Sequence, residues 1–449
     1  MRPLAPLVAL LLPMAAHAQA PYTLEEVGAM APGQRSFTNS PLLPYTGIPE
    51  GPSSIEPTDP GERGGEYATL DIGNFSLVAG PWTYADLSGD HILATLNEFL
   101  GRHENEYDFV SIFIAEPIDF GSFYSPLQNA TTGLGSEVFD QSTLWGFDEL
   151  EGYLFMNSIF DYQGSPRDAL FFGQEVGHRW GAYVRRAEGG RDMLGREDAH
   201  WSFFMESQNS TMEGNAWVET EQGVFETRHL DEIGYSQLDM YLMGFLDPDE
   251  VEDWFLIDNP VVLDNEYGWP TDIDSAPYYA VRALVSQEEA ESLAPIRVAG
   301  DRVDISIEDV IAENGPRVPG WDTSQREFDM AFVLMMPASD PITFDEYLVA
   351  EDTAEELTRL WEELVDGNAL LRHDLGQSGS YDFSPGAFAG APTWEGAFDP
   401  TSDTGIASGG CAASVGGGSR IAGGMCALLG LGLGLGRRRR RGATCCPSP

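Results

Sequence analysis

The stretch GQEVGHRWG, residues 173–181, places a carboxylate and a histidine on one predicted helix. The preceding residues SPRD, 165–168, offer a serine cap, a proline at the first helical position and an acid in the first turn. We therefore expect a helix from Pro166 to about residues 189–190, where two glycines follow each other. Gln174 and His178 are four residues apart, so their side chains project from the same helix face.

This spacing is typical of a catalytic zinc site. Such a site holds the metal with three protein ligands, and a carboxylate beside the metal acts as general base towards the bound water. Ligands at positions i and i+4 of a helix, with glutamate at i+1, provide that geometry. Glu175 fills the position of the base and His178 that of the second ligand. Gln174 stands where a histidine is usual, and its amide oxygen is a poorer zinc donor than an imidazole nitrogen.

Residues further along the chain extend the pattern. Gly181 follows His178 by three positions, where a glycine allows the helix to end and the chain to turn towards a third ligand. His200 follows in GREDAHWSFF, and Met212 follows in STMEGNAW. Residues 235–246, YSQLDMYLMGFL, predict a closing helix.

This order of motifs resembles the leishmanolysin-like branch of the metzincin zinc peptidases over about residues 161–246. The resemblance implies an α+β, zincin-like metallopeptidase domain with a mixed sheet, an active-site helix and a C-terminal subdomain. It makes Glu175 the general base and places Met212 in the turn under the metal. The zinc ligands that it implies are His178, His200 and Gln174. The chain also looks like a variant of secreted bacterial proteins that keep the motif HExGHRW intact.

Other assignments remain open at this point. Three carboxylates of the same region are rival third ligands and would make the site gluzincin-like: Glu206, Glu213 and Asp239. His200 is alternatively a hydrogen-bonded structural histidine, and Met212 an ordinary core residue. The loss of a ligand at Gln174 is also the way in which a peptidase becomes an inactive binding protein.

The composition excludes one class of partner. The 449 residues include 72 acidic and 24 basic ones, a formal net charge of −48, and every basic residue is an arginine. Binding of nucleic acid needs lysine or arginine side chains that neutralise phosphates, so we expect no nucleic-acid partner. With 42% hydrophobic residues, the chain is long enough to bury a large core.

Both ends of the chain predict export. An apolar run at residues 4–16, followed by AHA at 16–18, is typical of a signal peptide cut after Ala18. Near the other end, Cys411 precedes an apolar stretch, residues 421–436, and an arginine cluster, residues 437–441. This tail resembles the sorting tails of myxobacterial surface proteins, which implies cleavage by a sorting protease and anchoring at the cysteine. The alternative is a simple C-terminal membrane anchor. We expect the protein at the cell surface, in the outer membrane or outside the cell.

The predicted order of segments is a signal peptide, 1–18; a Pro/Gly-rich N-terminal segment, 19–75; a zincin-like domain, 76–260; a C-terminal subdomain, 261–390; a linker, 391–410; and the sorting tail, 411–449. Hydrophobic periodicity predicts further helices at residues 95–104 and 352–366. It predicts strands at 107–115, 153–159, 278–284, 297–307 and 328–336.

Three hypotheses about function follow. The first is a secreted, surface-anchored zinc metallopeptidase in which Glu175 activates a Zn²⁺-bound water for attack on a peptide carbonyl. The second is a catalytically inactive relative that binds a peptide or a surface partner through the same cleft. The third is a structural envelope protein whose helix only mimics the motif.

Overall fold

The computed structural model describes residues 67–103, 106–118, 121–142, 147–162, 166–186, 192–228, 234–279, 290 and 292–373. The predicted signal peptide, the linker, the sorting tail and nearly all of the predicted N-terminal segment lie outside these residues. The described part is a mixed α+β structure with several sheets. None of its helices combines the length and the apolar character that crossing a membrane requires.

A seven-stranded sheet forms the larger half of the structure, with strand order β1-β2-β14-β3-β7-β4 and β15 paired to β14. The inner strands β2, β14, β3 and β7 run parallel to one another, whereas β1 and β4 are antiparallel edge strands. The strands are β1 Ala68–Ile72, β2 Phe75–Gly80, β3 Phe109–Ile114, β4 Phe123–Pro126, β7 Gly152–Ser158, β14 Glu327–Pro337 and β15 Leu370–Arg372.

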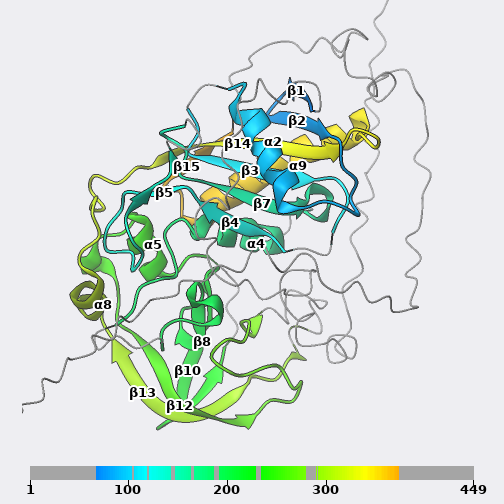
Figure 1. The fold of residues 1–449 in the computed structure, drawn as a ribbon. Helices are drawn as coiled ribbons and strands as arrows, with labels where there is room; N and C mark the ends of the chain where they lie inside the picture. Colours follow the sequence, from blue (N-terminus) through cyan, green and yellow to red (C-terminus); the bar gives the residue numbers. More distant parts are fainter. Residues whose placement is uncertain are drawn as a thin grey trace, which may run out of the picture.

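Helices cover both faces of this sheet, which explains why its central strands are apolar on both sides. Figure 1 shows α2, Gly89–Leu100, on one face and α4, Pro166–Gly177, with α9, Phe344–Leu364, on the other. Successive strand residues alternate between the two cores: Phe155 belongs to the core under α2, while Leu154 and Met156 belong to the core under α4 and α9.

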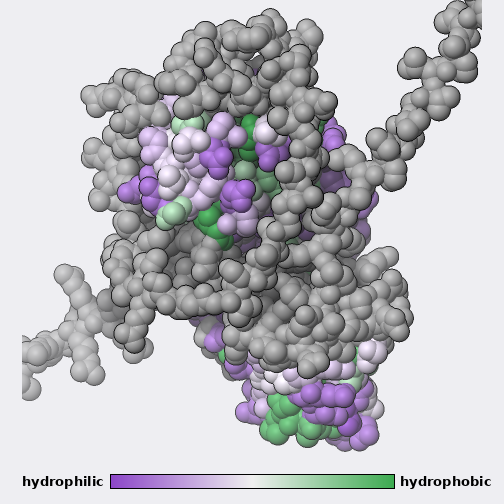
Figure 2. All heavy atoms as spheres, turned by 90° about the vertical axis from the view of Figure 1, so that its right-hand side faces the viewer, coloured by the Kyte–Doolittle hydropathy of each residue, from purple (hydrophilic) through white to green (hydrophobic). Residues whose placement is uncertain are grey.

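The smaller sheet has six strands in the order β10-β11-β13-β12-β8-β9. Its strands are β8 Trp201–Glu206, β9 Glu213–Asn215, β10 Trp217–Glu221, β11 Val224–Thr227, β12 Trp254–Asp264 and β13 Arg297–Ile305. The first residues of β12 are buried, but the strand continues past the core, and its Val261 is 60% exposed. Figure 2 shows hydrophobic and hydrophilic residues side by side at this lower end of the molecule.

Short elements lie between these strands and helices along the chain. They are helices α5 Gln237–Met243 and α8 Ile307–Asn314, the 3₁₀ turns η2 Ile159–Asp161, η3 Arg196–Asp198 and η4 Pro248–Glu250, and the hairpin of β5 Gln128–Asn129 with β6 Phe139–Asp140. In Figure 1, α4 lies between the large sheet and the smaller one. Side chains of α4 and of β8 share one continuous core, so the two sheets pack against a common interior.

Most predicted elements are confirmed with shifted ends. The strands expected at 107–115, 153–159, 297–307 and 328–336 are β3, β7, β13 and β14, and the helices expected at 95–104, 235–246 and 352–366 are α2, α5 and α9. The strand expected at 278–284 is not formed at its start, because Tyr278 lies in a turn and Tyr279 is helical; residues 280–284 lie outside the described part.

The predicted division at residue 260 does not separate the two sheets. Strand β14, from the predicted C-terminal subdomain, lies between β2 and β3 of the predicted zincin-like domain. Conversely, β8 to β11 of the predicted zincin-like domain belong to the smaller sheet together with β13. The two predicted domains therefore share both sheets, because strand pairing is decided by contacts far apart in the sequence.

Candidate functional site

Helix α4 carries the first of the predicted site residues. Its Phe172 and Val176 are buried, and the Phe172 ring stacks on Phe332 of β14 with centroids 6.2 Å apart. Gln174 and Glu175 are buried as well, with 5% and 7% of their surface exposed. Both polar side chains therefore need hydrogen-bond partners inside the protein.

The helix ends much earlier than the sequence predicts, at Gly177 instead of residues 189–190. After Gly177 the backbone tightens into 3₁₀-type bonds, from Arg179 N–H to the Val176 carbonyl and from Trp180 N–H to the Gly177 carbonyl. The hydroxyl of Tyr183 donates to the His178 carbonyl at 2.6 Å and so satisfies one of the acceptors left by the helix end. The side chain of Arg179 pairs with Glu151 and holds the turn in place.

His178 lies in this last turn, and the turn fixes its ring. Its Nδ1 is 3.1 Å from the carbonyl oxygen of Gly181, which can only accept a hydrogen bond. The proton of the neutral ring is therefore on Nδ1, and Nε2 keeps a free lone pair. Metal-binding histidines are commonly oriented in this way, by a backbone carbonyl on the second ring nitrogen.

His200 comes from a different segment and is oriented in the same way, by a backbone carbonyl on its Nδ1. The turn η3 precedes it, and the His200 Nδ1 lies 3.0 Å from the carbonyl oxygen of Arg196. The Gly195 N–H donates to the His200 carbonyl at 2.7 Å, which closes the loop. The two imidazole rings of His178 and His200 meet edge to face, with centroids 4.8 Å apart. The structure thus brings together two histidines that are far apart in the sequence.

A guanidinium group lies beside the lone pair of His200. Nη2 of Arg196 is 3.2 Å from Nε2 of His200, and the same guanidinium donates to Glu213 Oε1 from Nε at 2.9 Å and from Nη2 at 2.5 Å. The Gln174 amide nitrogen donates to the same carboxylate oxygen at 3.3 Å. We refer to these side chains together as the cluster, and an ion pair between Arg196 and Glu213 lies in its middle. Its members are Gln174, Glu175, His178, Arg196, His200 and Glu213.

Glu213 is the most enclosed member of the cluster. It is 1% exposed, and its Oε2 has no hydrogen-bond partner among the described residues. Its backbone has φ 77°, a left-handed conformation that is uncommon for a residue other than glycine and costs about 1–3 kcal/mol. The surrounding structure must hold this residue in place, and the Glu213 N–H donates to the Ser210 carbonyl at 2.9 Å.

Met212 lies against the end of α4. A Cβ atom added to Gly177 would be 2.4 Å from the Met212 sulfur, so the glycine permits a close approach. Met212 is 1% exposed and belongs to the core shared by the two sheets. Its place beside the helix end agrees in position with the turn methionine that the resemblance implies, and equally with a core residue.

Burial sets the charge states of the cluster. It raises the pKa of Glu175 to about 8, against the lowering effect of Arg196 and a hydrogen bond from the backbone N–H of Tyr124. Burial, together with His200, lowers the pKa of His178 to about 3. Burial and Arg196 hold the pKa of His200 well below its ordinary value. For Arg196, burial acts to lower the pKa, but Glu213 outweighs it and the pKa rises. At neutral pH both histidines are neutral and Arg196 is charged.

The other two rival ligands have different roles. Asp239 accepts hydrogen bonds from Trp201 Nε1 at 2.8 Å and from Ser210 and Ser236, and it closes the capping box of α5. Glu206 accepts from the backbone N–H of Trp217 and pairs with Arg228. Of the three carboxylates, only Glu213 lies with the histidines.

These residues, as placed, do not fit a zinc ion. The lone pair of His200 Nε2 accepts from Arg196, and Gln174 presents its nitrogen, a donor, to Glu213. Within the described ranges, no group of three or more His, Cys, Asp or Glu side chains is placed to hold a metal ion. The cluster instead satisfies a guanidinium with a carboxylate and an imidazole.

No relative of this chain was found among known proteins. The chain matches no known family model, no curated protein and no solved structure at a significant level.

Arg196 is the residue that sequence reasoning missed. It stands four positions before His200 in GREDAH, and an arginine among acidic residues is typical of an exposed surface. The sequence offers one signal for Arg196. In a helical turn, side chains four residues apart lie on the same face, so an arginine four positions before His200 can lie beside it. Its partner Glu213 is named by the sequence only as a rival metal ligand.

Proposed function

We propose that this protein is an exported, surface-held relative of zinc peptidases whose site is catalytically inactive and binds peptide. The observation that carries the proposal is the contact of the Arg196 guanidinium with both His200 and Glu213. In this proposal the charged side chain of Arg196 takes the place of the metal ion that the resemblance implies.

Electrostatic repulsion supports the proposal that Arg196 excludes a metal ion from the cluster. A divalent cation within about 4 Å of a guanidinium is repelled by several kcal/mol, even at an effective dielectric constant of about 20. Arg196 is stabilised in its charged form by Glu213, so it does not leave by losing its proton. Metal binding would require the side chain to move and Glu213 to change partner.

The residue at position 174 also supports an inactive site. Gln174 lacks the imidazole of a usual zinc ligand, and its amide nitrogen donates to Glu213 Oε1 at 3.3 Å. One of the implied ligands is therefore unsuited to holding the metal.

The arrangement of the fold supports a zincin-like domain in this proposal. A mixed sheet with an antiparallel edge strand, and a helix beneath it that carries Glu175 and ends just before His178, is what the resemblance implies for such a domain. The position of Met212 beside Gly177 supports the same assignment.

Strand β4 supplies a place for an extended peptide. It is an edge strand of the large sheet, at the end opposite β1, and among the described strands it pairs with β7 alone. The backbone of its Tyr124 interacts with the carboxyl of Glu175, so β4 lies beside the residue that the resemblance makes the general base. A peptide that adds a strand to this edge would bind through backbone hydrogen bonds and pass over the site.

Export and anchoring stay part of the proposal on the basis of the sequence. The segment cut after Ala18 and the tail beginning at Cys411 lie outside the described residues. Their order, an apolar N-terminal run and a Cys, apolar stretch and arginine cluster at the other end, supports a sorting protease as a transient partner.

A second candidate function is the zinc metallopeptidase itself, with His178, His200 and Gln174 as ligands of Zn²⁺ and Glu175 as base. The observation that favours it is the approach of the two imidazole rings to 4.8 Å, with both Nδ1 atoms on backbone carbonyls. In that function Arg196 would have to leave the cluster when the metal binds.

The proposal is tested by exposing the purified protein to a pool of unstructured peptides, with and without a chelator. Mass spectrometry measures cleavage, and co-purification measures retention. We expect intact peptides to be retained, equally with the chelator present and in the Glu175→Gln variant. Cleavage that the chelator and Glu175→Gln both abolish would overturn the proposal in favour of the peptidase. Absence of any retained peptide would overturn the binding function.

A further inference from the structure

His178 keeps a hydrogen-bond acceptor that nothing in the described part of the chain uses. Its Nδ1 is bonded to the Gly181 carbonyl, whereas its Nε2 has no partner among the described residues. His178 is partly exposed, and the fully enclosed, unpaired side-chain atoms within the described ranges lie on other residues. Nε2 is therefore open to solvent and presents a lone pair to a donor from outside.

Arg196 offers the opposite kind of group. Its Nε and Nη2 donate to Glu213, and Nη2 also contacts His200 Nε2. Nη1 has no partner in the described part of the chain and is not enclosed, since the Arg196 side chain is 16% exposed. The two N–H groups of Nη1 are therefore available to an acceptor from outside.

This free acceptor and this free donor both adjoin His200. The ring centroids of His178 and His200 are 4.8 Å apart, and Arg196 Nη2 is 3.2 Å from His200 Nε2. After burial and His200, the charge of Arg196 also contributes to the low pKa of His178, so the guanidinium is within electrostatic range of that ring. A ligand that uses both groups must carry a donor and an acceptor close together.

The backbone of an extended peptide carries such a pair. In an antiparallel ladder one residue gives both its N–H and its C=O to the neighbouring strand, and the next residue turns both groups to the other side. A peptide added to β4 would bond to β4 through alternate residues and turn the backbone groups of the residues between them away from β4. Figure 1 shows β4 at the edge of the large sheet that lies towards β8, the strand that follows His200.

We propose that one residue of the bound peptide donates its backbone N–H to His178 Nε2 and accepts from Arg196 Nη1 through its C=O. The inference rests on the proposed peptide binding and names the group that the cluster recognises, a single backbone unit of an extended peptide. Because every residue type except proline carries this N–H, the contact selects an extended backbone and not one kind of side chain.

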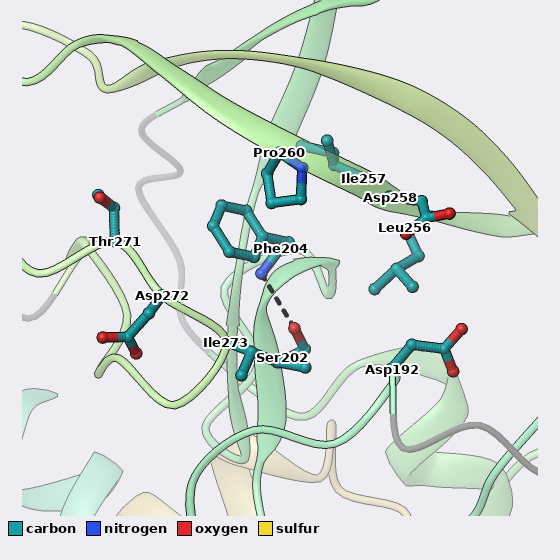
Figure 3. Close-up of a pocket in the computed structure, with 10 residues that line it drawn as sticks. All are labelled: Asp192, Ser202, Phe204, Leu256, Ile257, Asp258, Pro260, Thr271, Asp272 and Ile273. Carbon is teal, nitrogen blue, oxygen red and sulfur yellow. Dashed lines mark hydrogen bonds between the residues drawn. The ribbon is translucent and has the colours of Figure 1, made fainter.

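The pocket on the smaller sheet is separate from this contact. It has about 270 Å³ and is lined by Ser202 and Phe204 of β8, among others, but by no member of the cluster. Figure 3 shows Phe204 and Pro260 in its apolar middle, with the carboxylates of Asp258 and Asp272 directed away from it. The backbone contacts proposed for the cluster therefore do not depend on this pocket.

Backbone substitution in the peptide tests the contact. The probes are Ac-Thr-Val-Thr-Val-Thr-amide and five analogues, each with one amide N–H replaced by an ester oxygen, which keeps the shape of the peptide but removes the donor. Titration calorimetry of the full chain, with a chelator present, measures each affinity. We expect the ester that faces His178 to bind roughly three- to tenfold more weakly than the parent peptide, the fold-change of one hydrogen bond.

Variants identify the protein atoms. In His178→Ala that ester should bind as tightly as the parent peptide, because the acceptor is gone, while the esters that face β4 keep their loss and so show that the protein is folded. His91→Ala, a partly exposed histidine of α2, is the matched control and should leave every difference unchanged. Arg196→Lys keeps a positive charge beside Glu213 but lacks Nη1, so it should bind the parent peptide roughly tenfold more weakly.

The outcomes separate this inference from the proposed function. Ester losses that are identical in wild type and His178→Ala would overturn the contact with His178, and an unchanged affinity in Arg196→Lys would overturn the contact with Arg196. Both results leave peptide binding intact, because the parent peptide still binds. Failure of the parent peptide to bind the wild-type protein would instead contradict the proposed function, and this inference with it.

Discussion

Single residues decide the chemistry of the cluster, and Arg196 decides most of it. Its side chain is 16% exposed and that of Glu213 is 1% exposed, so the pair is largely removed from water. Charges in such a place are costly unless they are paired and hydrogen-bonded. Arg196 therefore has two roles. Its guanidinium neutralises the charge of Glu213, and it donates to the lone pair of His200 Nε2.

Replacement of Arg196 by methionine should show the cost of an unpaired Glu213. We expect Arg196→Met to lower the free energy of unfolding by about 3–5 kcal/mol in urea denaturation at neutral pH. Arg359→Met is the matched control, because Arg359 is exposed and pairs with Glu356 and Glu363 on the surface of α9; it should cost less than about 1 kcal/mol.

A double change separates pairing from packing. Arg196→Met with Glu213→Leu removes both charges and should recover most of the stability lost in the single variant. Equal losses for Arg196→Met and Arg359→Met would contradict a structural ion pair at the centre of the cluster.

Part of this cluster could be predicted from the sequence. Glu175, Gln174 and His178 were recognisable because their spacing is local to one helix. The pairing of Arg196 with Glu213 was not, because it depends on a loop that brings together residues 17 positions apart. An arginine looks the same in the sequence whether it faces water or a buried carboxylate.

Elements with continuous apolar runs were the most predictable, and their ends were the least. The runs in β3 and β14 give central strands because every residue of β3, and nearly every residue of β14, is buried. The end of α4 escaped prediction because Gly177 adjoins Met212 in space, and the chain then tightens to place His178 against Gly181.

The close approach of α4 to Met212 predicts a specific sensitivity. Gly177→Ala would place a methyl group 2.4 Å from the Met212 sulfur and should lower stability by about 1–3 kcal/mol. Gly89→Ala, at the start of α2, is the control, because no atom lies within 4 Å of the added carbon. There we expect a gain of about 0.4–1 kcal/mol in thermal or urea unfolding. A neutral Gly177→Ala would disprove the contact.

Strands β3 and β14 are also joined by Asp108, whose carboxylate accepts from the Asp329 N–H at 2.7 Å and from Gln325 Nε2 at 2.9 Å. Burial raises the pKa of Asp108 to about 6 from its ordinary value of 3.8. A carboxyl whose pKa is raised by folding binds its proton more tightly in the folded state, so stability falls as the pH rises from about 4 to about 6.

The size of this effect is measurable by unfolding the protein across that pH range. The difference between the two pKa values corresponds to roughly 3 kcal/mol at most. In Asp108→Asn this component should vanish, so the difference in stability between wild type and variant should change across that window. A constant difference would show that Asp108 titrates normally.

At the scale of the whole molecule, strands from distant parts of the sequence pair side by side in one sheet. Strand β14 comes from residues 327–337 and fills the place between β2 and β3, which come from residues 75–80 and 109–114. The sequence indicated the strands at 109–114 and 327–337 but neither the strand at 75–80 nor which strands pair, since pairing over such separations leaves no local pattern. A boundary at residue 260 therefore looked reasonable although it cuts through both sheets.

This arrangement predicts the behaviour of fragments. Residues 67–260 lack β14 and β13, and hence an inner strand of each sheet, so they should not fold. Residues 67–373 should unfold cooperatively. Circular dichroism during thermal unfolding distinguishes the two, with limited proteolysis as a second measurement. A cooperative transition in the shorter fragment would mean that the sheets form without these strands.

In the proposed inactive site, Arg196 takes the place of a metal ion between His200 and Glu213. Equilibrium dialysis against zinc, followed by elemental analysis of the protein, tests it most directly. Wild type should retain only substoichiometric zinc, and Gln174→His with Arg196→Gln should gain one zinc per chain, lost again when His178→Ala is added. Stoichiometric zinc in the wild-type protein that disappears in His178→Ala would contradict the account.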